Sequence, residues 1–349
     1  MKLKQVIEMI QPADEKSMQL CRRRWDSIAK PLHSLGKMED MLIKIAGMTK
    51  DTTMHLGKKA LIVMCADNGV VEEGVTQSGQ EVTAIVSENF WKTKATASIM
   101  CKTVGADIFP VDIGIAVDTN IINKKVAYGT KNMAKEPAMT KEEAIRAIEV
   151  GIDMVETLKE KGYGIIATGE MGIGNTTTSS AIAAILLDKK VEEVTGRGAG
   201  LSSEGLGRKI TCIQKAIQLH APDKEDAIDV IRKVGGLDIA GMTGVFLGGA
   251  ALGTPIIIDG FISAVSALLA VKLCPHTKDY MLASHISNEP AAVMLLKELG
   301  LEASLVCDMC LGEGTGAISL YPILDIANAV YEGMATFDAV NIEKYQPLR

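Results

Sequence analysis

The sequence has 349 residues and a formal net charge of −6, and 47% of its residues are hydrophobic but only 4% are aromatic. This length predicts about two domains, or one large body with an appended lobe. The negative charge and scarce aromatic side chains disfavour nucleic-acid binding, which needs a basic face and stacking platforms. Because no apolar run reaches the ~18 residues of a membrane span and no signal-peptide pattern is present, we expect a soluble, cytoplasmic protein without membrane contact.

The seven cysteines are spread through apolar context, and their odd number disfavours a disulfide scaffold. We therefore expect reduced thiols buried in the core. Cys307 and Cys310 have the two-residue gap of a zinc or redox pair, but no second pair or nearby histidine completes a metal site. Buried thiols are favoured over a metal site at these two positions as well.

The order of elements along the chain predicts an α/β fold. The first fifty-odd residues favour helices, with amphipathic spacing at 18–28 and 38–48. From residue 60 onward, short apolar strands alternate with longer helical segments, which is typical of a parallel sheet covered on both faces. We expect strands at 60–65, 107–113, 163–167, 254–258 and 279–283, with a weaker sixth at 303–307.

Helical segments are expected between these strands, at 81–90, 140–161, 175–187, 202–220, 223–234 and 261–273. Thr140 and Glu143 form a capping box at the start of one of them. The segment 124–138 has little periodicity and is predicted to be a surface loop. After Gly316 a helix is expected at 318–334, with Pro322 in its first turn.

Helical segments at both ends of the chain and a sheet between them predict a doubly wound parallel sheet with a small helical domain formed by both termini. We place the small domain at 1–58 plus 318–349. The large α/β domain, at 59–317, is expected to contain the active site.

The segment 168–178, Thr-Gly-Glu-Met-Gly-Ile-Gly-Asn-Thr-Thr-Thr, is the most informative motif because it joins a buried strand to a helix. Asn175 is a suitable N-cap residue, and free N–H groups at a helix start favour phosphate binding. Glu170 beside an anion site suggests a cationic substrate that also carries a phosphate. A glycine turn without any ligand is the alternative. Neither a P-loop nor a dinucleotide fingerprint is present.

Polar side chains also follow other expected strands, where open α/β sheets bind ligands. Asp259 follows one strand but could simply cap the next helix, and His285 follows another but could be structural. Glu313 lies between two glycines, with few partners in its own segment, so a functional role is favoured. Arg208 and Lys209 could reach a phosphate, with surface charge as the competing interpretation.

Several motifs in a fixed order carry a family resemblance: Lys30-Pro31 with Ser34-Leu35-Gly36, Cys65-Ala66-Asp67 with Gly69 and Glu73-Gly74-Val75, the motif at 169–177, the glycine-rich segment 235–245, Asp259-Gly260-Phe261, Ser284-His285 and Leu311-Gly312-Glu313-Gly314. Together they resemble the nicotinate-nucleotide:dimethylbenzimidazole phosphoribosyltransferase family, which acts in cobalamin lower-ligand assembly. The resemblance covers nearly the whole chain. It implies a Rossmann-like sheet with a small helical domain, a homodimer, and no metal or organic cofactor.

The resemblance also implies a reaction and residue roles. The enzyme would transfer the 5-phosphoribosyl group from nicotinate mononucleotide to an aromatic base such as dimethylbenzimidazole, giving an α-ribazole-type 5′-phosphate and nicotinate. Glu313 matches the catalytic general base, and Glu170 matches an acidic position near the ribose. The remaining matched positions would bind substrate: Gly172, Gly174, Asn175, Thr176 and Lys209 the phosphate, Ser287 the nucleotide, and Ser78 and Leu311 the base.

The sequence departs from the family pattern at the expected base pocket. Val86 stands where the family generally has Gln, and other departures are at Asn68, Gly79 and 32–33. Loss of a side-chain amide at Val86 predicts a more apolar base pocket. Phenol, p-cresol or a purine therefore stay open as alternative acceptors. A subunit of a heterodimer with a related chain, with reduced activity alone, is a further alternative.

Overall fold

A six-stranded parallel sheet forms the centre of the computed structural model, which describes residues 1–345. Its strand order is β3-β2-β1-β4-β5-β6. The strands are β1 (Lys58–Ala66), β2 (Ala106–Gly114), β3 (Ile122–Asn123), β4 (Tyr163–Met171), β5 (Ile256–Ile258) and β6 (Met281–Ala283). The chain order reverses between β1 and β4, so the sheet is doubly wound and Rossmann-like, as predicted.

The five main predicted strands are present, but the weaker sixth is wrong. Segment 303–307 forms only an isolated bridge between His285 and Leu305. The sixth strand is instead Ile122–Asn123, which pairs with Val111 and Asp112 of β2. Two residues are too few to produce a periodic sequence signal, which explains why this edge strand was missed.

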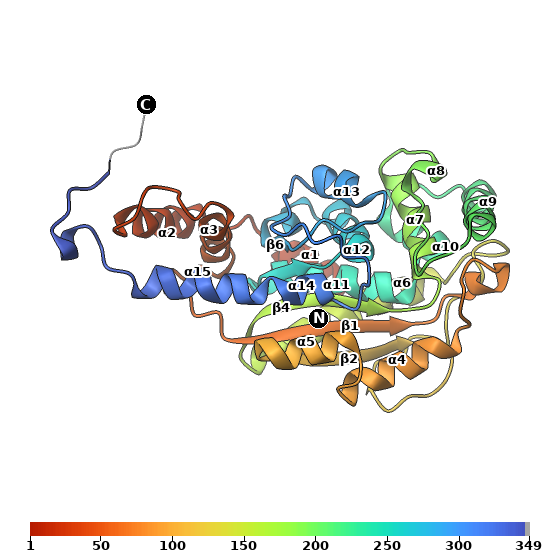
Figure 1. Cartoon of the computed structure of the whole chain (residues 1–349). Helices are drawn as coiled ribbons and strands as arrows, with labels where there is room; N and C mark the ends of the chain where they lie inside the picture. Colours follow the sequence, from red (N-terminus) through yellow and green to blue (C-terminus); the bar gives the residue numbers. More distant parts are fainter. Residues whose placement is uncertain (346–349) are drawn as a thin grey trace.

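Helices cover both faces of the sheet (Figure 1). One face packs against α4 (Glu81–Trp91), α5 (Thr96–Val104) and α14 (Thr315–Ser319). The other packs against α6 (Lys141–Glu160), α11 (Leu237–Leu252) and α12 (Phe261–Leu273). Farther from the sheet lie α7 (Asn175–Leu186), α8 (Val191–Val194), α9 (Ser203–His220), α10 (Ala227–Val234) and α13 (Ala292–Leu299).

Helix α11 was not expected, although its sequence belongs to the glycine-rich motif. It is buried on all sides, so it lacks the contrast between apolar and polar faces that reveals a helix. Its glycines allow close contact with α6, because a Cβ at Gly151 would meet the carbonyl of Gly241 and one at Gly244 would meet the carbonyl of Ile148. This packing fixes the start of α11 close to the carboxyl edge of the sheet.

Helices from the two chain ends pack together in a lobe beside the sheet (Figure 1). The lobe contains α2 (Glu15–Ser27), α3 (Lys37–Thr49) and α15 (Tyr321–Gly333). The rings of Trp25 and Tyr331 meet edge to face with centroids 5.1 Å apart. The predicted helix at 318–334 is divided at Leu320 into α14 and α15.

The N-terminal helix α1 (Leu3–Met9) packs on α6 and α11 rather than on α2. The N-terminal ammonium group lies 2.8 Å from a carboxylate oxygen of Asp153 in α6. Three short 3₁₀ helices complete the fold: η1 (Gly69–Glu73), η2 (Pro275–Tyr280) and η3 (Asp338–Val340). Residues 346–349 of the expected small domain lie outside the described residues.

Two local predictions agree with the structure. The capping box of α6 is confirmed, because Thr140 Oγ1 accepts the Glu143 N–H at 3.1 Å and Glu143 Oε2 accepts the Thr140 N–H at 2.8 Å. Segment 124–138 has no helix or strand and lies largely at the surface, as predicted, with Tyr128 64% exposed. It buries Met133 and Ala134, and the N–H of Thr130 donates to the carbonyl of Asp67.

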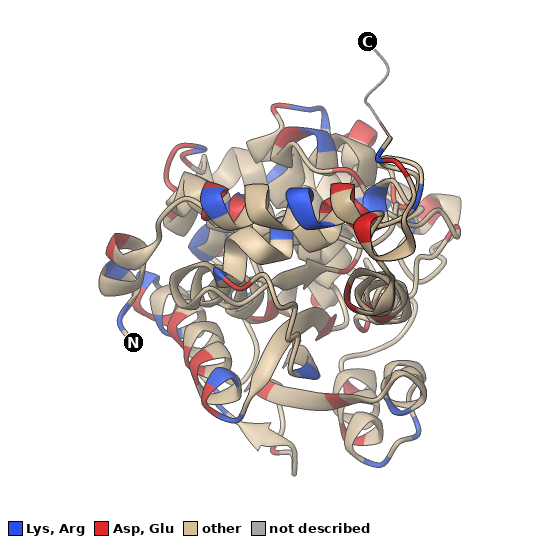
Figure 2. Cartoon of the chain, turned by 90° about the vertical axis from the view of Figure 1, so that its left-hand side faces the viewer, with Lys and Arg blue, Asp and Glu red and all other residues tan. Residues whose placement is uncertain are grey.

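Acidic and basic side chains are interspersed on the face shown in Figure 2, without a continuous basic stripe. Within residues 1–345, no helix combines the length and the apolar character needed to cross a bilayer.

Candidate active site

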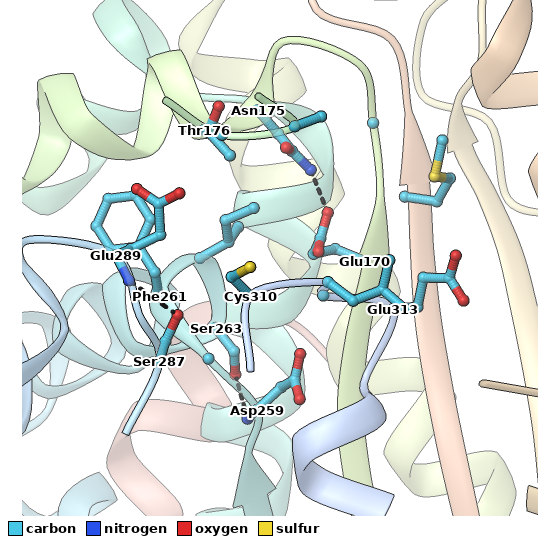
Figure 3. Close-up of a pocket in the computed structure, with 18 of the residues that line it drawn as sticks. Glu170, Asn175, Thr176, Asp259, Phe261, Ser263, Ser287, Glu289, Cys310 and Glu313 are labelled. Carbon is cyan, nitrogen blue, oxygen red and sulfur yellow. Dashed lines mark hydrogen bonds between the residues drawn. The ribbon is translucent and has the colours of Figure 1, made fainter. Parts of the chain in front are cut away.

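A cleft of about 280 Å³ lies beyond the carboxyl ends of β4, β5 and β6, next to the β1/β4 switch point (Figure 3). Open α/β sheets bind their ligands at this position. Eight of the eleven predicted site residues line the cleft: Val86, Glu170, Gly172, Asn175, Thr176, Ser287, Leu311 and Glu313. Residues that are far apart in the sequence therefore meet in one place.

The other three predicted residues, Ser78, Gly174 and Lys209, do not line the cleft. Lys209 is fully buried behind Thr176, and its Nζ donates to Thr176 Oγ1 at 2.9 Å and to the Gly196 carbonyl at 3.1 Å. Burial lowers the pKa of Lys209 to about 8. Lys209 therefore does not contact the cleft directly, and its positive charge acts there by polarising the Thr176 hydroxyl.

Gly174 and Ser78 shape the surroundings of the cleft. Gly174 has φ +96° at the start of α7, and a Cβ there would lie 2.9 Å from Val71 Cγ2, so a side chain would be both strained and crowded. Ser78 belongs to a loop whose neighbour Gln77 donates a hydrogen bond to the carbonyl of Gly200. Its own carbonyl accepts the Thr76 hydroxyl at 2.8 Å.

The start of α7 differs from the expectation in one respect. Gly174 is its N-cap residue and Asn175 is its first helical residue, so Asn175 does not cap the helix. The Asn175 amide instead donates to two buried carboxylates, Glu170 Oε2 and Asp238 Oδ2, the latter at 3.1 Å. Hydrogen bonds to a charged acceptor such as the Asp238 carboxylate are stronger than hydrogen bonds between neutral groups, which explains the changed role. The N–H of Thr176 has no partner within the described chain and remains available to an anion.

Glu170 lies on β4, one residue before the strand ends, and is 7% exposed. Burial raises the pKa of Glu170 to about 8, the nearby Asp238 carboxylate adds to the rise, and the Asn175 amide opposes it. The side chain is therefore protonated in the free protein at neutral pH. A cation placed beside it would favour the charged form.

Glu313 lies in a tight turn that packs against β4. The residues Gly312, Glu313 and Gly314 have φ values of +86°, +61° and +89°, and a Cβ at Gly169 would lie 2.6 Å from the Glu313 carbonyl oxygen. Glu313 Oε2 accepts the Ala97 N–H at 3.2 Å, at the start of α5. Burial raises the pKa of Glu313, and this main-chain N–H opposes the rise. In Figure 3 its carboxylate points away from Glu170, so the two acids serve different parts of the cleft.

Asp259 holds the Glu313 turn in place. Its carboxylate accepts N–H groups of Gly314, Gly316 and Ala317 at 3.2, 2.7 and 3.0 Å. Asp259 therefore caps α14, not the following helix α12, which has Gly260 as its N-cap residue. His285 is buried beside the cleft, with Nδ1 3.1 Å from the Ser284 hydroxyl. Both residues support the geometry of the site.

Several residues that line the cleft were not predicted from the sequence. Met171, the last residue of β4, adds an apolar side chain to the lining, and Phe261 and Glu289 lie near Ser287 in Figure 3. Burial raises the pKa of Glu289, and the Lys209 charge opposes the rise. Glu289 could have been predicted from the sequence, because it follows β6 at the carboxyl edge of the sheet.

The buried-thiol prediction holds for five cysteines and is wrong for two. Cys307 and Cys310 are exposed, since they lie in an irregular loop without a helix or strand to cover them. Cys310 borders the cleft. Among residues 1–345, no group of three or more His, Cys, Asp or Glu side chains is arranged to hold a metal ion.

Comparison with known proteins assigns the family. A family model described as phosphoribosyltransferase matches residues 10–342. The chain belongs to this family. Relatives named nicotinate-nucleotide–dimethylbenzimidazole phosphoribosyltransferase include those of Acetivibrio thermocellus, 50% identical over 98% of this chain and 99% of the relative, and of Clostridium acetobutylicum, 47% identical over the full length of both.

The phosphoribosyltransferase fold is also found among solved structures. A protein from Thermus thermophilus, described as CobT, has a TM-score of 0.89 with 36% sequence identity. The match covers 95% of this chain and all of that protein. The family resemblance, the Rossmann-like fold class and the assignment as a pentosyltransferase enzyme are therefore confirmed.

Proposed function

We propose that the enzyme transfers the 5-phosphoribosyl group of nicotinate mononucleotide to dimethylbenzimidazole. The proposal rests chiefly on one observation: two acids with raised pKa values, Glu170 and Glu313, border one cleft beside the start of α7. The names of the relatives support this acceptor and give no support to phenol, p-cresol or a purine. The products would be nicotinate and an α-ribazole-type 5′-phosphate.

The first half of the reaction breaks the bond between ribose C1′ and the pyridinium nitrogen. The bonding electrons move to the nitrogen, so nicotinate departs with a neutral ring and C1′ gains positive charge. Ionised Glu170 stabilises this charge from the floor of the cleft. The 5′-phosphate binds at the start of α7, where the Thr176 N–H is free and Lys209 supplies positive charge through its hydrogen bond to the Thr176 hydroxyl.

The second half forms the new bond between C1′ and a ring nitrogen of the base. The other ring nitrogen loses its proton to Glu313, which acts as the general base. Val86, Met171 and Leu311 provide the apolar walls against which the ring packs. Ser287, which lines the cleft, contacts the nucleotide, and the family resemblance assigns Ser78 to the base. No metal or organic cofactor is required by these steps.

We also propose a cytoplasmic homodimer, with a heterodimer as the alternative, and the domain boundaries given above. Exposed apolar side chains on α4 and α5 support a subunit contact: Ile85, Trp91 and Ile99 are 57%, 62% and 54% exposed. Sedimentation of the pure chain tests the oligomeric state. A stable, fully active monomer would contradict the dimer.

The reaction is tested by incubating the enzyme with nicotinate mononucleotide and an equimolar mixture of dimethylbenzimidazole, phenol, p-cresol and adenine. We expect nicotinate release and one dominant product whose mass is that of the ribosylated dimethylbenzimidazole 5′-phosphate. EDTA should not change the rate. A dominant product from another acceptor would overturn the proposed substrate, and absence of nicotinate release would overturn the reaction.

A further inference from the structure

A second buried carboxylate lies directly behind Glu170. Asp238 is the second residue of α11, has no exposed surface, and does not line the cleft. Its Oδ2 accepts one hydrogen bond from Asn175 Nδ2, and the same nitrogen donates to Glu170 Oε2. Because an amide nitrogen carries two protons, Asn175 can bridge the two acids at once.

Neither acid has a cationic partner among the described residues. Glu170 and Asp238 are absent from the ion pairs of residues 1–345, and Asp238 Oδ1 has no hydrogen-bond partner there. The fully buried side chain of Asn68 is also unpartnered within this range, at both Oδ1 and Nδ2. Burying unpaired charge and unsatisfied polar groups costs several kcal/mol in general. The cluster of Glu170, Asp238 and Asn68 is therefore not explained by a contribution to the stability of the fold.

The main chain is shaped to admit these groups. A Cβ at Gly172 would lie 2.8 Å from Asp238 Oδ2 and 3.1 Å from Asn68 Nδ2. A Cβ at Gly236 would meet Asp238 Oδ1 and lie 2.7 Å from Asn68 Oδ1. Both segments come this close to the polar side chains because they carry glycine. The phosphate-side turn at Gly172 is thereby connected to Asp238.

We propose that Asp238 is a positioning residue that acts through the Asn175 amide, aiming the Glu170 carboxylate at C1′ and controlling the charge it presents there. This inference rests on the proposed function. Burial, together with repulsion by the Asp238 carboxylate, keeps Glu170 neutral in the free enzyme. When nicotinate mononucleotide binds, its cationic pyridinium ring favours ionisation of Glu170, which loses its proton. The negative charge then lies beside C1′, where positive charge develops during the reaction.

The electrostatic surroundings are consistent with one proton shared by the pair. Burial raises the pKa of Asp238 to about 6, the Asp67 carboxylate adds to the rise, and the Asn175 amide and main-chain N–H groups at the start of α11 oppose it. The pKa of Glu170 is about 8. The other groups that act on Glu170 are the Asp259 carboxyl, which raises its pKa, and the Glu313 N–H, which lowers it. Near pH 7 the proton resides mainly on Glu170.

The affinity for nicotinate mononucleotide is therefore expected to depend on pH. Since bound cation favours ionised Glu170, binding releases a proton at neutral pH, and affinity for nicotinate mononucleotide rises as the pH approaches the pKa of Glu170. Asp238→Asn removes the repelling charge and lowers that pKa. The rise in affinity should therefore move to lower pH, and proton release at pH 7 should decrease.

The experiment measures nicotinate mononucleotide binding to the intact enzyme by calorimetry in two buffers of different ionisation enthalpy, across pH 6–9, together with kcat. We expect wild type to release a fraction of one proton per site at pH 7, and Asp238→Asn to release less. We also expect kcat to fall about tenfold because Glu170 is less well aligned. Asp226→Asn, at the N-cap of α10, is the matched control and should leave both quantities unchanged.

An unchanged pH profile in a folded Asp238→Asn enzyme, with only a lower melting temperature, would overturn the inference. If that variant does not fold, the wild type still decides, because binding without proton release at pH 7 contradicts the shared proton. Failure of the proposed function is recognised separately, as absence of nicotinate release by the wild type with dimethylbenzimidazole.

Discussion

Glu170 and Glu313 border the same cleft, but the chain holds them by different means. Glu170 is carried by the rigid end of β4, and a side-chain amide fixes its buried carboxylate. Glu313 lies in a glycine turn, is half-buried, and receives a main-chain N–H from α5. A group that stabilises charge at one point gains from rigidity, whereas a general base must exchange its proton with solvent after each turnover. Glu170 is therefore suited to electrostatic stabilisation, and Glu313 to proton transfer.

The largest expected effect is on the proton-transfer side. Glu313→Gln removes the general base, so we expect kcat to fall by about 10²–10⁴-fold. The affinity for nicotinate mononucleotide should stay within about twofold, because Glu313 points away from Glu170 in the cleft. Steady-state kinetics and calorimetry measure the two quantities. A variant that keeps wild-type turnover would remove Glu313 from the mechanism.

Glu170→Gln tests the other side of the comparison. We expect kcat to fall about 10²-fold, because the developing charge at C1′ loses its counter-charge. The pH dependence of nicotinate mononucleotide binding near the pKa of Glu170 should disappear, unlike that of Glu313→Gln. If the pH dependence persists in Glu170→Gln, another group titrates.

The same variant has an effect on stability. Folded Glu170 keeps its proton up to a pKa of about 8, whereas an unfolded glutamate loses it near pH 4.5. Between these values the folded state binds more protons, so the free energy of unfolding decreases as pH rises. Glu170→Gln should weaken this decrease. Urea unfolding at pH 5 and pH 8 measures the difference.

A glycine substitution tests how the two acids are kept apart. Gly312 has φ +86°, and a Cβ there would lie 2.5 Å from Glu170 Oε1. We expect Gly312→Ala to lower kcat about tenfold and stability by about 1–3 kcal/mol. Gly300→Ala is the control for backbone strain, since Gly300 also has positive φ, at +66°, but no atoms within 4 Å of the added Cβ. Equal loss of kcat in both variants would contradict a specific contact with Glu170.

The smallest expected effect concerns the base pocket near Glu313. Val86→Gln adds an amide that can hydrogen-bond to the base, so we expect KM for dimethylbenzimidazole to fall by a few-fold while KM for nicotinate mononucleotide is unchanged. Val86→Leu, which adds no polar group, is the control. A change in both KM values would show that Val86 does not act on the base alone.

The sequence predicts the sheet and the cleft well because both depend on strong local signals. Each main strand is a continuous apolar run, and polar residues after a strand must gather at one edge of a parallel sheet. The predictions are weaker where tertiary contacts decide. Asn175 has the chemistry of an N-cap residue, but only the fold brings Glu170 and Asp238 within its reach. Lys209 has the charge for phosphate binding, but α9 places it behind Thr176.

Helix α11 and the exposure of Cys307 and Cys310 also depend on tertiary contacts and were not predicted from the sequence. Uniform apolar sequence hides a helix, and apolar neighbours in the sequence do not guarantee burial in an irregular loop. The function of Asp259 as a cap of α14 depends on residues more than fifty positions away, so no local pattern encodes it.

The order in which the chain is synthesised has a consequence for the terminal lobe. Helices α2 and α3 are synthesised before the six strands, yet their partner α15 is synthesised after them. Trp25 therefore lacks its ring contact with Tyr331 on the nascent chain until α15 has been synthesised. The turn with Glu313 is also made after all six strands. A chain whose synthesis stops soon after β6 would contain all six strands but lack the general base Glu313. It would also expose an apolar surface to which chaperones bind.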